Sequence, residues 1–317
     1  MRVSAPGKMM ISGEYAVLAG AEAVVAAVDR RAFASLRQGG MPSGSPEVQA
    51  AFRAAQAQVG AVEGEVVLDV SSMRLDGLKI GLGSSAAGAA AAAGLVFAAH
   101  GQDPSSPAVR QQILDTALRG HHAVSPKGSG ADVAAAVLGG FIRFRRLGDT
   151  IESHALAWPA EAELRVVWTG HEARTSDFVA RVEELAAQAP ATYRRALSAL
   201  GRESESFVAA ALAQDTAGLV ESTDAYGAAM GELGRAAGVD IVTDTLAEIA
   251  RAAREAGGAA KPSGAGGGDV AIGVFPSADA AARFERLCAA AGLRLLSVQL
   301  GAPGVRLETS ATSSEAA

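Results

Sequence analysis

Lysine is rare in this sequence and occurs only in or beside glycine-rich segments. Of the 28 basic residues, four are lysines and the other 24 are arginines. Lysine carries a compact point charge that can approach phosphate oxygens closely, whereas arginine presents a broad planar fork. The pattern therefore predicts a site that handles phosphate groups. The four residues are Lys8, Lys79, Lys127 and Lys261, each in or beside a glycine-rich segment.

The segment Gly81–Ser85, which leads into an alanine-rich run, has the composition of a phosphate-binding loop. Glycines let the backbone approach an anion, and the first N–H groups and the dipole of a following helix bind phosphate. Ser84 and Ser85 are favourable helix N-caps whose hydroxyls can also bind phosphate or Mg²⁺. The alternative for so short a motif is a capped helix after a tight turn.

The same segment also matches a dinucleotide-binding fingerprint, Gly-x-Gly-x-x-Ala from Gly81 to Ala86, with Asp103 about twenty residues further on. However, Asp103 precedes Pro104 in an expected loop, and no regular βαβ unit surrounds the motif. The Gly-Lys-Ser/Thr loop of classical ATPases is absent from the sequence. An oxidoreductase is therefore a weaker alternative, which binding of a nicotinamide cofactor would reveal.

Two further segments combine lysine with glycine. The segment Lys261–Asp269 is expected to be a loop with four glycines in five positions. Such a loop is costly to order unless its backbone must approach another group, although a flexible hairpin is the alternative. The segment Ala5–Leu18 contains Lys8 directly before the apolar residues Met9–Ile11. Because the fold must bury those residues, we expect Lys8 to be partly enclosed and to need an anionic partner.

Apolar runs and alanine-rich periodic segments succeed one another without regular βαβ alternation, which predicts an α+β fold. The expected strands are 9–11, 23–28, 33–35, 65–70, 141–146, 163–168, 269–275, 293–300 and 305–307. The expected helices are 84–100, 107–122, 131–138, 175–189, 191–213, 217–237, 243–256 and 278–291, and 38–46 is expected to be a loop. A change of composition after Gly148 places a soft domain boundary at 150–160.

Composition narrows the class of protein. The net charge of −6, without a basic stripe, disfavours nucleic acid as a partner. The single cysteine, Cys288, excludes an internal disulfide and a multi-cysteine metal site. The N-terminus shows no signal peptide and the apolar run 86–99 is too short to span a bilayer, so a cytoplasmic protein without a membrane partner is expected. The polar tail 309–317 is expected to be disordered.

In their order and spacing, the three glycine-containing motifs resemble those of the GHMP kinase superfamily over nearly the whole chain. The resemblance implies a two-domain GHMP kinase fold. Its N-terminal, ATP-binding domain, of the ribosomal protein S5 domain 2 type, would span 1–155, and a ferredoxin-like C-terminal domain would span 156–317. ATP and the acceptor would then lie in the cleft between the two domains.

Within the superfamily, the sequence resembles the phosphomevalonate kinases more than the mevalonate kinases. Tyr15 stands where mevalonate kinases usually have histidine, and Lys79 introduces the phosphate loop as in phosphomevalonate kinases. The segments Lys127–Ala134, Gly140–Arg146 and Trp168–Thr175 resemble further elements of that group. A mevalonate kinase or another small-molecule kinase of the superfamily is the nearest alternative, and a nucleotide or metabolite sensor without catalytic activity is another.

The resemblance also implies the residues of the site. Lys8 and Asp132 are expected to be catalytic, and Ser85 is the expected Mg²⁺ ligand. The expected ATP-binding residues are Lys79, Gly81, Leu82, Gly83, Ser84, Ser85 and Ala86. The expected substrate-binding residues are Lys8, Tyr15, Lys127, Ser129, Gly130, Ser263, Gly264, Ala265 and Gly266.

Two positions depart from the family pattern. Lys127 is one residue closer to Gly128 than the pattern implies. Eleven residues before Asp132, where mevalonate kinases have a Mg²⁺-binding glutamate, this chain has His121. Because histidine is a poor ligand for Mg²⁺, we expect the metal to be held by Ser85, phosphate oxygens and water.

The implied reaction passes the γ-phosphoryl group of ATP to 5-phosphomevalonate, giving 5-diphosphomevalonate and ADP in the mevalonate route to isoprenoids. Lys8 is expected to bridge the γ-phosphate and the acceptor phosphate, and Asp132 to orient Lys8 or to act as a weak base. The alternative for Asp132 is a favourable charge at a helix N-terminus, and for Lys79 and Lys127 it is a solvated loop position. The enzyme is expected to be a monomer or a homodimer whose partner is a small phosphorylated substrate.

Overall fold

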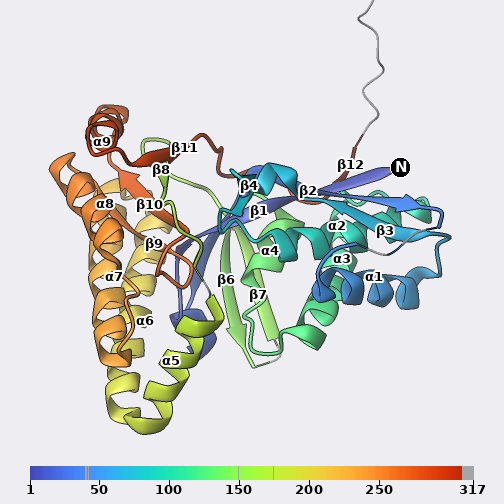
Figure 1. Ribbon diagram of the computed structural model, residues 1–317, viewed down its shortest axis with the longest axis horizontal. Coiled ribbons are helices and arrows are strands. Elements are labelled where there is room, and N and C mark those ends of the chain that lie inside the picture. Colours follow the sequence, from blue (N-terminus) through green and yellow to red (C-terminus); the bar gives the residue numbers. More distant parts are fainter. Residues whose placement is uncertain (40, 42, 149, 174, 309–317) are drawn as a thin grey trace, which may run out of the picture.

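The computed structural model describes residues 1–39, 41, 43–148, 150–173 and 175–308. Within them, the chain forms two halves that lie side by side, each with its own β-sheet and helices (Figure 1). The α+β fold expected from the sequence is confirmed. The tail 309–317, for which the sequence predicts disorder, lies outside the described residues, as does Arg174 of the segment Trp168–Thr175.

The N-terminal half is built on an antiparallel sheet. Its strands follow the order β12-β1-β2-β6-β7, and β3 pairs with the C-terminal part of β2. The strands are β1 (Arg2–Ser12), β2 (Ala23–Arg37), β3 (Glu65–Asp69), β6 (Phe141–Leu147), β7 (Thr150–Leu156) and β12 (Arg306–Leu307). Shorter elements of this half are the 3₁₀ helices Ala16–Ala19 and Ser71–Met73 and the strands β4 (Arg74–Leu75) and β5 (Leu78–Lys79).

Strand β2 is one continuous strand of 15 residues, although its sequence pattern predicts two strands. The polar residues Asp29 and Arg30 interrupt the apolar pattern. They are accommodated by a bulge, because the register with β1 shifts between Pro6 and Gly7. The strand therefore continues through the polar residues at which the apolar pattern stops.

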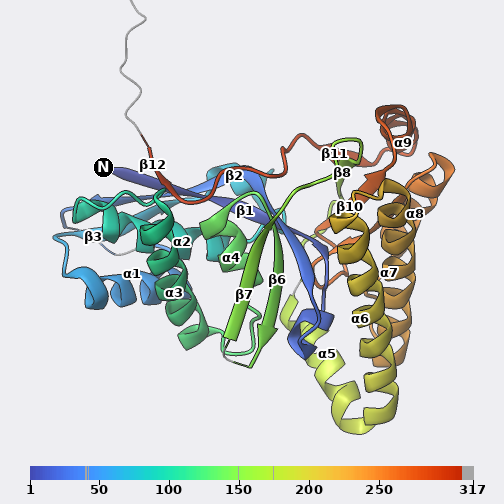
Figure 2. The same cartoon turned by 180° about the vertical axis from the view of Figure 1, so that it is seen from behind.

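Four helices cover one face of this sheet, with α2 and α4 against the strands and α1 and α3 packed on α2 (Figure 2). They are α1 (Pro46–Val59), α2 (Ser84–Ala99), α3 (Pro107–Val124) and α4 (Ala131–Leu138). Helix α1 is missing from the sequence prediction. The signal was present, because its buried residues recur at helical spacing. These buried residues are Val48, Ala51, Phe52 and Ala55.

Helix α2 is buried along most of its length, from Ala86 to Ala98. Its small residues let neighbouring elements approach closely. A β-carbon on Gly88 would lie 2.8 Å from the Leu68 side chain, and one on Gly94 would lie 2.8 Å from Val305. This close packing fixes the start of the helix relative to the sheet. Among the described residues, no helix is both long and apolar enough to cross a membrane.

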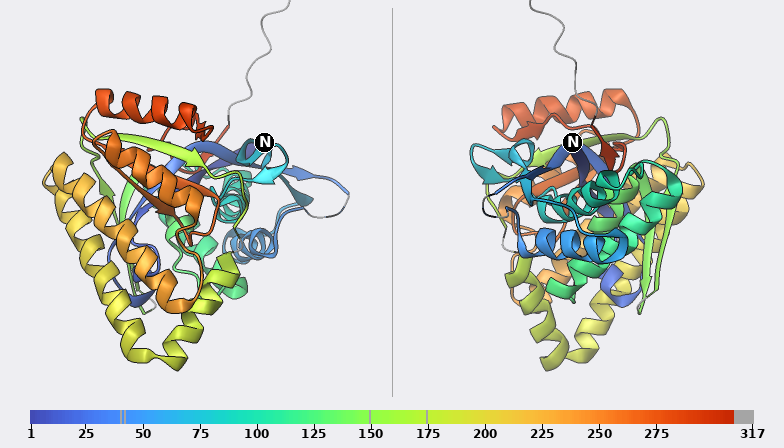
Figure 3. Two further views of the ribbon diagram at one scale, coloured as in Figure 1. Left: turned by 60° about the vertical axis from the view of Figure 1, so that its left-hand side comes forward. Right: turned by 90° about the vertical axis from the view of Figure 1, so that its right-hand side faces the viewer.

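The C-terminal half contains an antiparallel sheet in the order β11-β8-β10-β9, with a layer of long helices packed beside it (Figure 3). Its strands are β8 (Glu163–Trp168), β9 (Ala259–Ser263), β10 (Val270–Phe275) and β11 (Arg294–Leu296). Its helices are α5 (Thr175–Gln188), α6 (Pro190–Leu212), α7 (Thr216–Ala237), α8 (Asp244–Glu255) and α9 (Ala278–Ala290). Strand β11 is shorter than the predicted strand 293–300, and β9 begins two residues before Lys261, where the sequence predicts a loop.

The chain changes sheets between β7 and β8, close to the predicted boundary at 150–160. It returns to the first sheet at its end, because β12 pairs with β1 and Leu300 forms a bridge with Val28. The division into 1–155 and 156–317 stays a prediction, and the strand pairing places the last described residues with the N-terminal half.

A buried ion pair joins the two halves and corrects the expectation for Lys261. Lys261 lies in β9 with its side chain fully buried, and its Nζ donates a hydrogen bond to Glu14 Oε1, just after β1. Burial lowers the pKa of Lys261 from its ordinary value, and the Glu14 carboxylate opposes that change. Glu14 Oε2 is buried without a hydrogen-bond partner among the described residues. Lys261 is therefore a structural residue between the halves rather than part of a phosphate site.

The substitution Lys261→Met is expected to lower the free energy of unfolding by roughly 3–5 kcal/mol, because it leaves a buried carboxylate without its counter-charge. Adding Glu14→Gln to the same chain should recover part of the loss. Urea unfolding followed by circular dichroism measures both changes. The matched control is Lys127→Met, at a side chain that is 75 % exposed, which should cost less than about 0.5 kcal/mol. A Lys261→Met variant as stable as this control would contradict the assignment.

Candidate active site

Lys8 crosses the loop that precedes α2. Its backbone N–H donates to the Leu82 carbonyl at 2.9 Å, which ties the loop to β1. A β-carbon on Gly83 would lie 2.8 Å from the Lys8 Cγ, and Gly83 has a φ of +73°, in the left-handed region. Only glycine meets both conditions without strain, so this position lets the lysine lie over the loop. Lys8 is partly buried, as the sequence predicts.

The phosphate loop is anchored by two apolar side chains, Ile80 and Leu82, which are buried in the core. Helix α2 begins at Ser84, and its N-cap is Gly83 rather than one of the serines that the sequence favours. The left-handed conformation of Gly83 places the cap one residue earlier. The hydroxyls of Ser84 and Ser85 are consequently not used as caps. The first N–H groups of the helix have no partner within it and, with the helix dipole, suit an anion.

The Ser85 hydroxyl lies against the carboxylate of Glu47, a residue that no motif of the sequence marks. Ser85 Oγ donates to Glu47 Oε2 at 3.0 Å, and Ser125 Oγ donates to Glu47 Oε1 at 3.2 Å. Ser45 Oγ lies 2.8 Å from Ser85 Oγ. Burial raises the pKa of Glu47, but hydrogen bonds from the three serines and from its own backbone outweigh burial and hold the pKa below its ordinary value. The carboxylate is therefore ionised at neutral pH.

Asp269 is a second carboxylate that the sequence analysis misses. It ends the glycine-rich loop, and its Oδ1 accepts a hydrogen bond from the Ala173 N–H at 3.1 Å. A β-carbon on Gly81 would lie 2.7 Å from Asp269 Cβ, so the two loops touch. Burial raises the pKa of Asp269 above its ordinary value, against the Ala173 hydrogen bond and the charges of Lys8 and Lys79. An acidic residue directly after a glycine run was the signal available in the sequence.

Lys8, the loop before α2 and Asp269 line one cleft of about 330 Å³, which is within the usual size range of small-molecule sites. Glu47 does not line it but contacts its lining through Ser85. The predicted site residues that line it are Lys8, Lys79, Gly81, Leu82, Gly83, Ser84, Ser85, Asp132, Ser263, Gly264 and Ala265. Six other predicted residues, all within the described part of the chain, do not line it: Tyr15, Lys127, Ser129, Gly130, Gly266 and Ala86, of which Ala86 is buried in α2. Two of the four lysines thus share a cleft with the phosphate loop.

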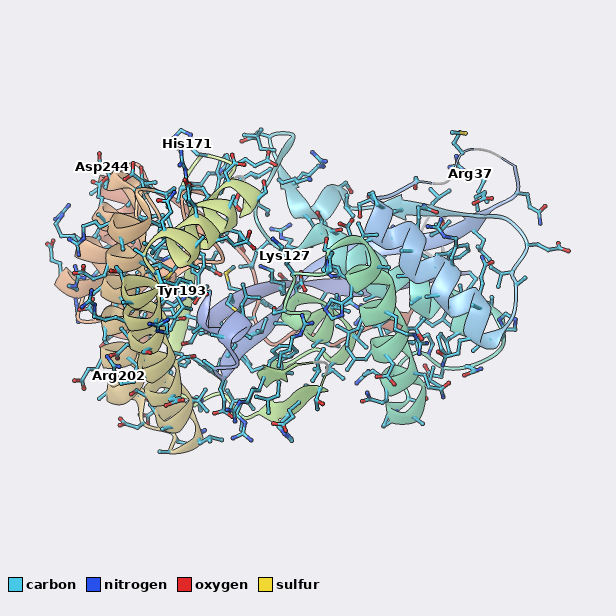
Figure 4. All side chains as sticks on the ribbon, turned by 90° about the horizontal axis from the view of Figure 1, so that it is seen from below. Arg37, Lys127, His171, Tyr193, Arg202 and Asp244 are labelled. Carbon is cyan, nitrogen blue, oxygen red and sulfur yellow. The ribbon has the colours of Figure 1, made fainter. Side chains whose placement is uncertain are left out.

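A second cavity, of about 530 Å³, adjoins this cleft and shares part of the glycine-rich loop with it. The predicted site residues that line it are Tyr15, Lys127, Ser129, Gly264 and Ala265. Lys127 Nζ donates to both carboxylate oxygens of Glu183, at 2.9 Å each. Figure 4 shows Lys127 between the two halves of the molecule. Lys127 therefore lies at the neighbouring cavity rather than beside Lys8.

The glycine-rich loop is held against the residues that end β1. Ser263 Oγ donates to the Met10 carbonyl at 2.8 Å, and the Tyr15 hydroxyl donates to the Ala265 carbonyl at 2.5 Å. Burial and the nearby Glu14 carboxylate raise the pKa of Tyr15 above its ordinary value, so its hydroxyl remains a donor. These contacts set the distance between the two sides of the cleft.

Asp132 lies in the first turn of α4, at the edge of the cleft. Its Oδ1 accepts a hydrogen bond from the Val133 N–H at 2.9 Å, and its Oδ2 lies 3.9 Å from His121 Nε2. Among the described residues, His121 is the basic side chain within ion-pairing distance of Asp132. Lys8 and Asp132 therefore share the cleft without forming an ion pair with each other.

Known proteins match both halves of the chain. The family model for the GHMP kinases N terminal domain matches residues 47–140, and the model for GHMP kinases C terminal matches residues 208–292. The phosphomevalonate kinase of Streptomyces sp. (strain CL190) is 30% identical over 86% of this chain and 88% of that protein. The chain belongs to the GHMP kinase family.

Two further proteins are similar to this GHMP kinase. The mevalonate kinase of Aeropyrum pernix is 29% identical, over 97% of this chain and 98% of that protein. The structure of Streptococcus pneumoniae phosphomevalonate kinase in complex with phosphomevalonate and AMPPNP has a TM-score of 0.82 at 18% identity, over 95% of this chain and 99% of that one. This structural likeness concerns the fold, and the predicted two-domain GHMP kinase fold is confirmed.

Membership of the family makes this GHMP kinase a phosphotransferase, as the sequence predicts, and implies ATP as the phosphoryl donor. The N-terminal family match includes the phosphate loop together with Glu47 and Asp132. The C-terminal match includes the glycine-rich loop. Lys8 lies outside both matches, so its place in the site rests on the geometry of β1.

Proposed function

We propose that this GHMP kinase acts in the mevalonate pathway and transfers the γ-phosphoryl group of ATP to 5-phosphomevalonate, giving 5-diphosphomevalonate and ADP. The observation that carries the proposal is the meeting of Lys8 and Lys79 in one cleft with the phosphate loop. Lys127, at the adjoining cavity, adds a third cation. Such a grouping suits a reaction in which two polyanions must be brought together.

The reaction forms a bond from an oxygen of the acceptor phosphate to the γ-phosphorus. It breaks the bond from the γ-phosphorus to the β,γ-bridging oxygen, whose electron pair leaves with ADP. The second pKa of a phosphate monoester is about 6, so the acceptor oxygen is mostly deprotonated at neutral pH and needs no strong base. The protein must therefore chiefly align the two phosphates and neutralise their charge.

The predicted roles follow from where the groups lie. Lys8 lies against Gly83 of the phosphate loop and lines the cleft, which supports its proposed role of bridging the γ-phosphate and the acceptor phosphate. The first N–H groups of α2 bind the phosphates of the nucleotide. Lys79, at the end of β5, contributes charge to the cleft, and Lys127 binds the acceptor after leaving Glu183. Asp132 positions groups at the edge of the cleft or acts as a weak base.

The residues beside the phosphate loop fit a Mg²⁺ ion, which the use of ATP leads us to expect. Ser85, at the start of α2, has its Oγ within hydrogen-bond distance of the Glu47 carboxylate, and hard oxygen donors of this kind suit Mg²⁺. The described residues form no group of three His, Cys, Asp or Glu side chains that could hold a metal alone. Ser85 would therefore contribute a hydroxyl to the Mg²⁺, which phosphate oxygens and water would also bind. The ion would supply positive charge against the phosphates of the nucleotide.

Mevalonate kinase activity is the nearest alternative, because the enzyme from Aeropyrum pernix is similar at nearly the same identity. Its acceptor is an alcohol, whose proton must be removed during transfer. Asp132 would then be required as a general base. The cations around the two cavities favour an acceptor that already carries a phosphate.

The acceptor is tested by ADP release, with 5-phosphomevalonate and mevalonate compared at equal concentrations. We expect kcat/KM for 5-phosphomevalonate to exceed that for mevalonate by at least about 100-fold, because only the phosphorylated acceptor can use the lysines. Mass spectrometry of the product identifies 5-diphosphomevalonate. A preference for mevalonate would replace this function by the alternative, and turnover with neither acceptor would contradict both.

The substitution Lys8→Met is expected to lower kcat by at least about 100-fold, because it removes the charge that bridges the two phosphates. Lys8→Arg should also lower kcat, since a broad planar fork does not reproduce the compact charge of lysine. Steady-state kinetics measures both changes. A thermal unfolding midpoint equal to that of the unaltered enzyme verifies that each variant is folded. Turnover of Lys8→Met near that of the unaltered enzyme would show that Lys8 has no part in the transfer.

The substitution Asp132→Asn is expected to lower kcat by about tenfold or less, because a deprotonated acceptor needs no general base. The profile of kcat against pH should keep its shape. If Asp132 were the base, the loss would be about 10²–10⁴-fold and the acidic limb of the profile would disappear. The comparison thus separates positioning from proton transfer.

A further inference from the structure

One carboxylate stands directly beside the phosphate loop and is paired with hydroxyls rather than with cations. Glu47 lies in the first turn of α1 and accepts hydrogen bonds from Ser85 at 3.0 Å and from Ser125 at 3.2 Å. Ser85 belongs to the first turn of α2, and Ser125 follows the last turn of α3. Oxygen atoms from three helices and their ends thus meet at Glu47, beside Ser85, which lines the cleft.

A carboxylate in this place conflicts with nucleotide binding unless a cation accompanies the nucleotide. The N-terminus of α2 and the lysines favour anions, and ATP would bring its phosphates close to Ser85. An ionised Glu47 would repel those phosphates through the same electrostatics. A divalent cation between the carboxylate and the phosphates turns this repulsion into attraction.

The other carboxylates near the cleft are less suited to a metal. Asp269 faces Lys8 and Lys79, whose positive charges would repel a cation. Asp132 lies against His121 and accepts the Val133 N–H. Among the described residues, the groups that act on Glu47 are instead hydroxyls and its own backbone, and none of them is a cation.

The hydroxyl partners also allow the exchange that metal binding requires. Each serine oxygen is both a donor and an acceptor, and its proton rotates freely. Ser85 and Ser125 can satisfy Glu47 while the metal is absent. They can then turn their lone pairs toward a metal that the carboxylate binds. Mg²⁺ is typically held by one or two carboxylates together with substrate phosphates and water, which matches this donor set.

We propose that Glu47 supplies the protein carboxylate for the Mg²⁺ of the bound nucleotide, beside the Ser85 hydroxyl. The assignment rests on the proposed function only in that it requires ATP binding, and it is independent of which acceptor is phosphorylated. It places the carboxylate on α1, in a part of the chain where the sequence predicts neither a helix nor a ligand.

The test measures how much Mg²⁺ increases the affinity of the enzyme for the nucleotide. The dissociation constant of AMPPNP is determined by calorimetry without acceptor, once with MgCl₂ and once with EDTA. The ratio of the two constants is the metal enhancement. For Glu47→Gln we expect this ratio to fall by about 10- to 100-fold, while the affinity in EDTA stays the same or rises because a negative charge is lost. The matched control is Glu63→Gln, at an exposed glutamate, which should leave both constants unchanged.

A second variant keeps the test decisive if the glutamine substitution disturbs the fold. Glu47→Asp keeps the charge but withdraws the carboxylate by one methylene, so the metal enhancement should again fall at least several-fold. An unchanged enhancement in both variants, or equal losses of affinity with and without metal, would mean that Glu47 only supports the loop, and would overturn the assignment. An unaltered protein that does not bind AMPPNP at all would overturn the proposed function as well.

Discussion

The ion pair between Glu14 and Lys261 is the contact on which the geometry of the cleft depends. It is buried between β1 and β9, so it fixes two segments that belong to different halves of the molecule. The Gly264 N–H contacts the same carboxylate at 3.4 Å, and the Tyr226 hydroxyl donates to the Glu14 carbonyl at 2.7 Å. A buried pair of this kind adds little net stability but is costly to break, so it favours one arrangement of the two halves. Lys8, six residues before Glu14 on the same chain segment, is thereby held at a set distance from the glycine-rich loop.

Features that depend on local backbone chemistry could be predicted from the sequence. Gly81 and Gly83 are needed where the chain adopts a positive φ. The alanine-rich sequence predicts the helix that begins at Ser84. Whether a charged side chain is buried depends instead on partners that are distant in the sequence. Lys261 lies close to a glycine run, which predicts a position in a loop. Glu14, the residue that neutralises its charge, is 247 positions away. Its burial could not be foreseen from its neighbours.

The same limit applies to the carboxylates of the site. Glu47 meets Ser85 across 38 positions and Ser125 across 78, through the packing of α1 on α2 and α3. Asp269 meets the Ala173 N–H across 96 positions, because β10 and β8 are neighbours in the second sheet. Motif reasoning finds residues that bind through loops and helix ends. It misses acidic residues in ordinary surroundings, since glutamate and aspartate are common on solvated surfaces.

The charges around the cleft indicate more about its ligand than the lysines alone. A pocket for a simple anion would gain most from positive charge only, yet Asp132, Glu172 and Asp269 line this cleft together with Lys8 and Lys79. Such a mixture disfavours an isolated phosphate and suits a ligand that carries charges of both signs, as a metal-bound polyphosphate does. Under the proposed function, the lysines would act where the nucleotide and the acceptor meet, while the carboxylates would limit the binding of anions that arrive without a metal. If the acceptor is phosphorylated, as proposed, such discrimination matters, because a uniformly positive cleft would bind the nucleotide and the acceptor each in the place of the other.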